Sequence, residues 1–174
     1  YIITNPNSNT KIIIENNEFI SNVGEAGDGN VFIKSEGEIS LKGTNFTHNI
    51  AMKTANNDVQ DEADGNTGSL SITSESSTTI TISECQFTYN EAANNHGALF
   101  CSLQNKLSSI VLYNCLFSGN IAGGKSGAAH FNVGSSERMI VSITDCLFEN
   151  NTAKIDYSAL YFDSVTEESE INLS

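Results

Sequence analysis

The sequence predicts an all-β protein, a parallel β-helix of five to six coils with roughly 30 residues in each coil. Three observations lead to this prediction. A short phrase, Phe-x-x-Asn, recurs five times along the 174 residues. Short apolar segments that alternate with period two flank each copy, and no helical pattern lies between the copies. The abundance of Asn, Ser and Thr, with a single proline, favours polar turns and β-strands over helices.

The repeat sets the length of the coil. Its copies stand at 19–22, 46–49, 87–90, 117–120 and 148–151. Successive phenylalanines are 27, 41, 30 and 31 residues apart, and the long interval carries an insertion at about 52–67. Strands this short cannot bury a hydrophobic core within one coil. When the coils stack, each position of the repeat, which we call a slot, lies about 4.8 Å above the same slot in the previous coil. We therefore expect one β-helix domain over residues 1–174.

Each copy contains two strands that the sequence can place in order. The first is an alternating run before the phenylalanine, at 12–15, 39–42, 80–83, 110–113 and 141–144. The second is an apolar run that follows a glycine or serine, and its copies read GNVFI, GSLSI, GALFC, GAAHF and SALYF. The chain ends on INLS at 171–174, which begins a sixth copy. Neither end has a cap, so we expect either an excerpt of a longer array or coil ends that stack on neighbouring subunits.

Equivalent slots carry the same residue type, which identifies structural ladders. The aromatic slot predicts an interior stack of Phe19, Phe46, Phe87, Phe117 and Phe148. The amide slot predicts a corner at which Asn binds the backbone and the amides of adjacent coils and tolerates left-handed geometry. Its members are Asn22, Asn49, Asn90, Asn120 and Asn151.

Three of the four cysteines share the slot two residues before the phenylalanine, namely Cys85, Cys115 and Cys146. We expect a buried row of free thiols, which pack as small hydrophobic groups. One disulfide between neighbouring coils is the alternative. Zinc is disfavoured because side chains that point the same way in a row do not converge tetrahedrally.

The pairing of Phe-x-x-Asn with a Gly-Ala-hydrophobic step resembles the repeats of the polymorphic outer membrane proteins, a family of autotransporters. All five Phe-x-x-Asn copies match. In the second motif HGAL and SGAA match best, GNVF and TGSL are looser, and SALY lacks the glycine. The resemblance covers nearly the whole chain. It implies a right-handed β-helix at the cell surface that acts in adhesion or as a translocated passenger, and not chiefly as an enzyme.

The charge balance limits the partners. Eight basic and 21 acidic residues give a net charge of −13, and without a basic cluster this argues against nucleic acid and anionic lipid. No apolar run approaches the roughly 20 residues of a membrane-spanning helix. Acidic residues scatter among turns, and the histidines lie in different slots, so we expect no catalytic residues, no metal and no cofactor. The alternative is a carbohydrate-active β-helix enzyme, a polysaccharide lyase or glycosidase.

Two further features concern modification and calcium. The insertion gathers acidic side chains next to a glycine, but their spacing departs from the EF-hand template, which favours a solvated loop over a calcium site. These residues are Asp58, Asp61, Glu62 and Asp64. Candidate glycosylation sequons begin at Asn45, Asn150 and Asn172, in a number that chance alone would give in this composition.

The strand after the glycine gives the most specific indication of function. Its uniformly apolar slot is predicted to point inward, so the alternate slot points outward and carries the rings of Phe32, Phe100, His130 and Tyr161. Exposed contiguous apolar surface marks an interface. A loop of the same chain, a protein partner and stacking sugars are all open as occupants. We expect a non-enzymatic extracellular or cell-surface protein, an adhesin passenger, stalk or filament building block, that associates through this row and its coil ends.

Overall fold

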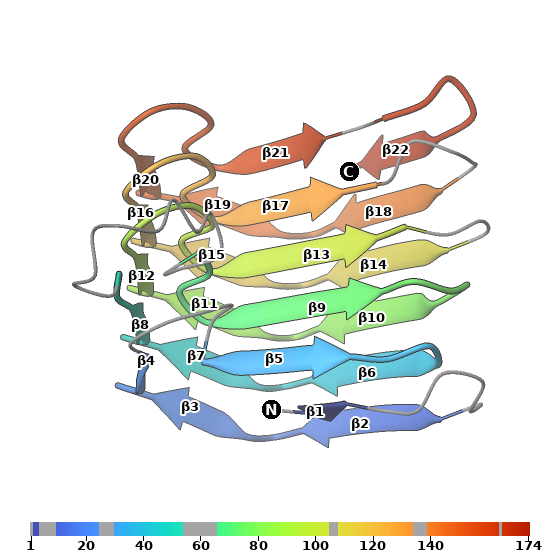
Figure 1. Cartoon of the computed structure of the whole chain (residues 1–174), viewed down its shortest axis with the longest axis horizontal. Coiled ribbons are helices and arrows are strands. Elements are labelled where there is room, and N and C mark those ends of the chain that lie inside the picture. The colour runs from blue at the N-terminus through green and yellow to red at the C-terminus, as the bar shows by residue number, and fades with distance from the viewer. Residues whose placement is uncertain are drawn as a thin grey trace.

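The computed structural model describes residues 2–3, 10–24, 30–53, 66–104, 108–133, 139–163 and 165–174. These residues form a parallel β-solenoid of about five turns, in which every strand pairs with its equivalents in the adjacent coils (Figure 1). The fold class predicted from the sequence is thereby confirmed. The described residues contain strands and no helix, so none of them forms a helix that could span a membrane.

Four parallel sheets run along the stack, and we name them A to D. Sheet A contains β1 (Ile2–Ile3), β5 (Val31–Lys34), β9 (Leu70–Ser74), β13 (Leu99–Leu103), β17 (Ala129–Asn132) and β21 (Leu160–Asp163). Sheet B contains β2 (Lys11–Glu15), β6 (Glu38–Lys42), β10 (Thr79–Ser83), β14 (Ser109–Tyr113), β18 (Ile140–Thr144) and β22 (Glu170–Leu173). Both correspond to strands that the alternating pattern predicts.

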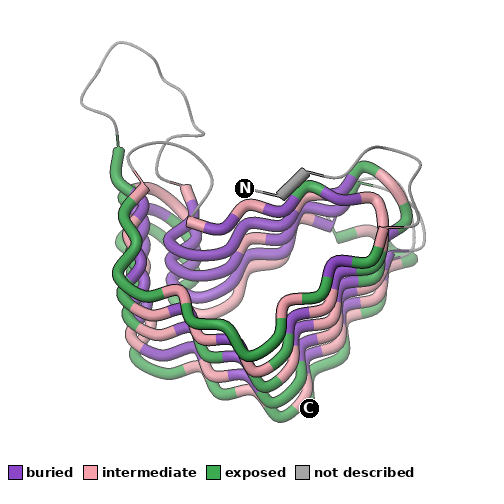
Figure 2. Tube along the Cα trace, turned by 90° about the horizontal axis from the view of Figure 1, so that it is seen from below, coloured by how far each residue is buried: buried purple, intermediate pink, exposed green. Residues whose placement is uncertain are grey.

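The two remaining sheets are narrower. Sheet C contains β3 (Glu18–Ile20), β7 (Asn45–Thr47), β11 (Gln86–Thr88), β15 (Leu116–Ser118) and β19 (Leu147–Glu149). Sheet D contains the two-residue strands β4 (Val23–Gly24), β8 (Ile50–Ala51), β12 (Glu91–Ala92), β16 (Ile121–Ala122) and β20 (Thr152–Ala153). One coil thus passes through sheets B, C, D and A in turn, and Figure 2 shows the coils superimposed along the stack.

The register follows the repeat. Phe46 pairs with Phe19 on one side and Phe87 on the other, and the same alignment continues to Phe117 and Phe148. The rings stack with centroids 4.7 to 5.0 Å apart, close to the spacing between coils. Together with inward Ile and Leu side chains of sheets A and B, they form the hydrophobic core of the described residues.

The asparagine row lies at the corner between sheets C and D. Each amide but the last donates to the amide oxygen of the next coil, at 2.9 or 3.0 Å, and each but the first donates to a phenylalanine carbonyl of the preceding coil. The expectation that these asparagines adopt left-handed geometry is wrong. The residue before each one has the positive φ, between 53° and 66°: Ser21, His48, Tyr89, Gly119 and Asn150. That residue turns the chain, which leaves the asparagine side chain directed at the backbone.

All three sequon asparagines lie within the described residues. Asn45 is half-buried in β7, Asn150 is exposed at the C–D corner, and Asn172 is exposed in β22 with its amide donating to Glu170. The acidic residues of the insertion, Asp58 to Asp64, lie outside the described residues.

Candidate functional site: the aromatic face

The outward row of sheet A runs across five adjacent coils. Phe32, Ser71, Phe100, His130 and Tyr161 pair in register from β5 to β21. Their neighbours Val31, Leu70, Leu99 and Ala129 are buried in the core, and Leu160 is half-buried. Because successive side chains of a strand point to opposite faces, the row lies on the outer surface of the sheet.

A second row lies at the turn that leads into sheet A. It consists of Thr67, His96, Ser126 and Tyr157, each four residues before a member of the outward row. Backbone hydrogen bonds place these residues in adjacent coils, because Gly68 binds the carbonyl of His96, Gly97 that of Ser126, and Gly127 that of Tyr157. His96, Ser126 and Tyr157 have positive φ values of 54°, 62° and 62°. We call the two rows together the aromatic face.

The turn row covers part of the outward row. The ring of His96 stacks on Phe100 with centroids 4.3 Å apart, and Tyr157 stacks on Tyr161 at the same distance. His130 is only 8% exposed and Ser71 is fully buried, whereas Phe32, Phe100 and Tyr161 are half-buried. The expectation of an open exterior ladder of four rings is therefore wrong in detail, because side chains of the same chain pack over it. Sequence alternation carries no signal for this cover, because it depends on the backbone conformation of the turn.

Two imidazoles meet on this face. Nδ1 of His130 lies 2.6 Å from Nε2 of His96, in the adjacent coil, and the ring centroids are 4.6 Å apart. His130 also lies between Phe100 and Tyr161, at centroid distances of 5.2 and 4.5 Å. The two histidines are far apart in sequence, and only the stacking of coils brings them together.

Burial keeps both imidazoles neutral. Burial, and to a smaller extent the neighbouring His130, lower the pKa of His96 to about 3, while the backbone of Asn66 acts in the opposite direction. Burial also lowers the pKa of His130 to about 4, where Asp163 and Lys125 have opposing effects. At neutral pH each ring therefore carries one proton, and the short contact between them is a hydrogen bond between neutral rings.

The aromatic face also gathers buried polar atoms that lack hydrogen-bond partners. In the part of the chain that the structure describes, five side-chain atoms are of this kind, and all five belong to the two rows. They are Oγ1 of Thr67, Oγ of Ser71, Nδ1 of His96, Oγ of Ser126 and Nε2 of His130. Buried polar groups are usually paired. Their concentration here distinguishes this face from the rest of the described surface.

The cysteine row is separate from this face. Cys85, Cys115 and Cys146 are free thiols at the corner between sheets B and C, and each thiol donates to the carbonyl two residues earlier, at 3.2 to 3.3 Å. Cys101 is fully buried in β13, and burial raises the pKa of its thiol. Among the described residues no group of three or more His, Cys, Asp and Glu side chains is placed to hold a metal ion.

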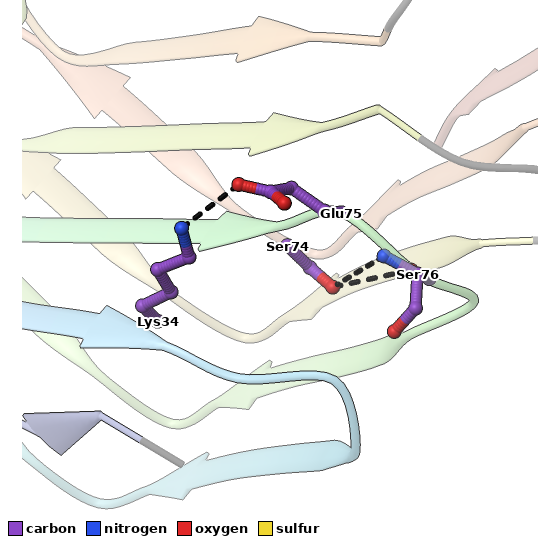
Figure 3. Close-up of polar contacts among 4 residues, drawn as sticks. All are labelled: Lys34, Ser74, Glu75 and Ser76. Carbon is purple, nitrogen blue, oxygen red and sulfur yellow. Dashed lines mark hydrogen bonds and ion pairs between the residues drawn. The ribbon is translucent and has the colours of Figure 1, made fainter. Parts of the chain in front are cut away.

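The corner between sheets A and B is polar. Lys34 and Glu75, in adjacent coils, form an ion pair of 2.8 Å, and the hydroxyl of Ser74 lies 3.1 Å from the carbonyl of Ser76 (Figure 3). A second ion pair, between Lys11 and Glu38, lies beside an open hollow lined by polar side chains. Exposed pairs of this kind contribute little to stability.

Comparison of the chain with protein-family models, curated proteins and solved structures finds no match.

Proposed function

We propose that this chain is a non-enzymatic structural β-solenoid of an extracellular or cell-surface protein, which associates with a protein partner or with further copies of itself through the aromatic face. The observation that carries the proposal is the outward row of sheet A, where Phe32, Phe100 and Tyr161 are half-buried and keep part of their rings accessible. Rings of this size supply most of the contact energy of interfaces.

The remainder of the molecule supports a scaffold role. The same side chains recur at the same position in coil after coil, and backbone bonds, amides and rings all join each coil to the next. Such a stack is stiff along its axis and displays an extended surface. The resemblance to autotransporter passengers supports a location outside the cell.

The proposal is tested by removing the accessible rings. We expect the double substitution Phe100→Ser with Tyr161→Ser to weaken self-association, measured by sedimentation velocity over a concentration series, and to leave the circular dichroism spectrum unchanged. Tyr89→Ser is the matched control, because Tyr89 is exposed on the C–D corner. Association that survives the double substitution, or that Tyr89→Ser weakens equally, would show that the aromatic face is not the interface.

A carbohydrate-active enzyme stays the alternative prediction. It requires two carboxylates on either side of a scissile bond, or a base with calcium, in a groove. Incubation with a panel of acidic and neutral polysaccharides, followed by measurement of new reducing ends and unsaturated uronates, tests it directly. Catalytic release of either product would replace the proposal of a non-enzymatic scaffold.

A further inference from the structure

We propose that His96 and His130 form a binding site for a divalent transition-metal cation of the zinc, nickel and copper class. The inference goes beyond the proposed function and does not depend on it. Two imidazole nitrogens, Nε2 of His96 and Nδ1 of His130, lie 2.6 Å apart. One comes from the turn before β13 and the other from β17 in the next coil.

Both rings are held in place by packing. His96 lies flat on Phe100, with an interplanar angle of 7°, and His130 lies between Phe100 and Tyr161. Each histidine is 8% exposed. The two candidate ligand nitrogens therefore already face each other, and little side-chain freedom is lost on binding.

The chemistry of the contact allows a cation to replace a proton. Neutral imidazole has one donor and one acceptor nitrogen, so the two facing nitrogens share a single proton in the metal-free protein. When each ring carries its proton on the outer nitrogen, Nδ1 of His96 and Nε2 of His130, both inner lone pairs face one point. Zinc bonds of about 2.0–2.1 Å at a tetrahedral angle would set the two nitrogens about 3.3 Å apart, a separation that requires the rings to move by under about 1 Å.

Neighbouring residues set the polarity and charge around the two histidines. Ser126 follows His96 in the turn row and belongs to the same coil as His130, and its fully buried Oγ has no hydrogen-bond partner among the described residues. Asp163 favours positive charge at His130, whereas Lys125 opposes it. The net charge of −13 attracts cations to the molecule as a whole.

The ligand types define the class of cation. Imidazole suits zinc, copper and nickel, whereas calcium and magnesium prefer oxygen ligands. With two protein nitrogens and no third His, Cys, Asp or Glu grouped with them among the described residues, water must fill part of the coordination shell. We therefore expect selectivity for transition metals over calcium and magnesium.

Isothermal titration calorimetry at neutral pH tests the site with zinc chloride and nickel chloride, and with calcium chloride as the comparison. We expect one equivalent of zinc or nickel to bind the intact chain, and His96→Gln and His130→Gln each to weaken binding at least tenfold. His48→Gln is the matched control, because His48 is exposed and stacks on Tyr89 at another corner. Absence of a zinc or nickel heat, or equal binding by all three variants, would overturn the proposal.

A measurement on the unsubstituted chain guards against variants that fail to fold. Electron paramagnetic resonance of the protein loaded with one equivalent of Cu²⁺ reports the ligand nitrogens through their hyperfine couplings. We expect coupling to two imidazoles. A spectrum with oxygen ligands alone, or a calcium heat equal to that of zinc, would place the cation at carboxylates and would contradict the proposal.

Discussion

Nδ2 of Asn90 lies 3.0 Å from Oδ1 of Asn120, and this bond joins two fully buried amides in adjacent coils. Asn90 also donates to the carbonyl of Phe46 and accepts from the backbone and the amide of Asn49. One side chain thus bonds polar groups of both adjacent coils. Buried groups that lose their partners are costly, so this row couples the coils to one another.

The first prediction is that Asn90→Ala lowers the free energy of unfolding by about 3 kcal/mol or more, because several buried donors and acceptors lose their partner at once. Urea denaturation followed by circular dichroism measures the loss. Asn22→Ala is the matched control, since Asn22 is exposed and, among the described residues, its amide donates to Asn49 alone. Equal losses in the two variants would show that the amides act locally and do not couple the coils.

The second prediction concerns the aromatic stack. Phe87 is fully buried between Phe46 and Phe117, with centroids 4.8 and 4.7 Å away and interplanar angles of 2° and 4°. We expect Phe87→Ala to lower the free energy of unfolding by about 3–5 kcal/mol, because the lost ring leaves a cavity inside the tube. Guanidinium denaturation measures it. Phe19→Ala, at the half-buried end of the stack, should cost clearly less.

The sequence predicts the architecture because the coils are in register. Every coil carries Phe and Asn at the same position, so each recurrence of Phe-x-x-Asn in the sequence predicts residues that stack. Phe46 and Phe87 pair in this way although 41 residues separate them. The inward and outward sides of sheet A follow from the same alternation, since Leu99 is buried and Phe100 is not. The periodicity thus predicts which residues form the phenylalanine and asparagine ladders.

The turns could not be predicted in this way. The left-handed residue before each asparagine is variously Ser, His, Tyr, Gly or Asn, so the backbone conformation repeats although the residue type does not. For the same reason the sequence does not predict that the turn row packs over part of the outward row. The side chain of His96 folds back onto Phe100 because its turn has positive φ, and sequence alternation does not report that angle.

The third prediction concerns the glycine that recurs at the turn before the strands of sheet A. A Cβ on Gly97 would lie 2.0 Å from the carbonyl oxygen of Gly127 in the next coil, and Gly68 meets the carbonyl of Gly97 in the same way. Backbone atoms cannot move aside without opening the stack. We expect Gly97→Ala to lower the melting temperature, at a cost of about 1–3 kcal/mol or more.

Gly24→Ala is the control for this third prediction. A Cβ on Gly24 would meet its nearest neighbour, Oδ1 of Asn30, at 3.5 Å, an ordinary contact. We therefore expect a change in melting temperature close to zero for this variant. Should Gly97→Ala be as stable as Gly24→Ala, the coils would have to lie farther apart at this turn than the structure places them.

The fourth prediction is a loss of stability in mild acid. His96 and His130 have folded pKa values of about 3 and about 4, below the ordinary value of 6.5. Between pH 6.5 and about 4 the unfolded chain therefore binds more protons than the folded chain. The contribution of the two histidines to the free energy of unfolding is fully present above pH 6.5 and decreases as the pH falls towards 4. Asp163 and Lys125, the charged groups acting on His130, oppose each other and do not remove the effect of burial.

Denaturation at a series of pH values from 7 to 4 measures this loss, and comparison with variants separates it from the titration of carboxylates. The double substitution His96→Gln with His130→Gln removes both titrating groups from the aromatic face, so its stability should vary less steeply over this range. His48→Gln, at the exposed corner, should keep the steep dependence. A constant difference in unfolding free energy between the double variant and the unsubstituted chain at every pH would mean that the two imidazoles are solvated in the folded protein, and that burial does not hold them neutral.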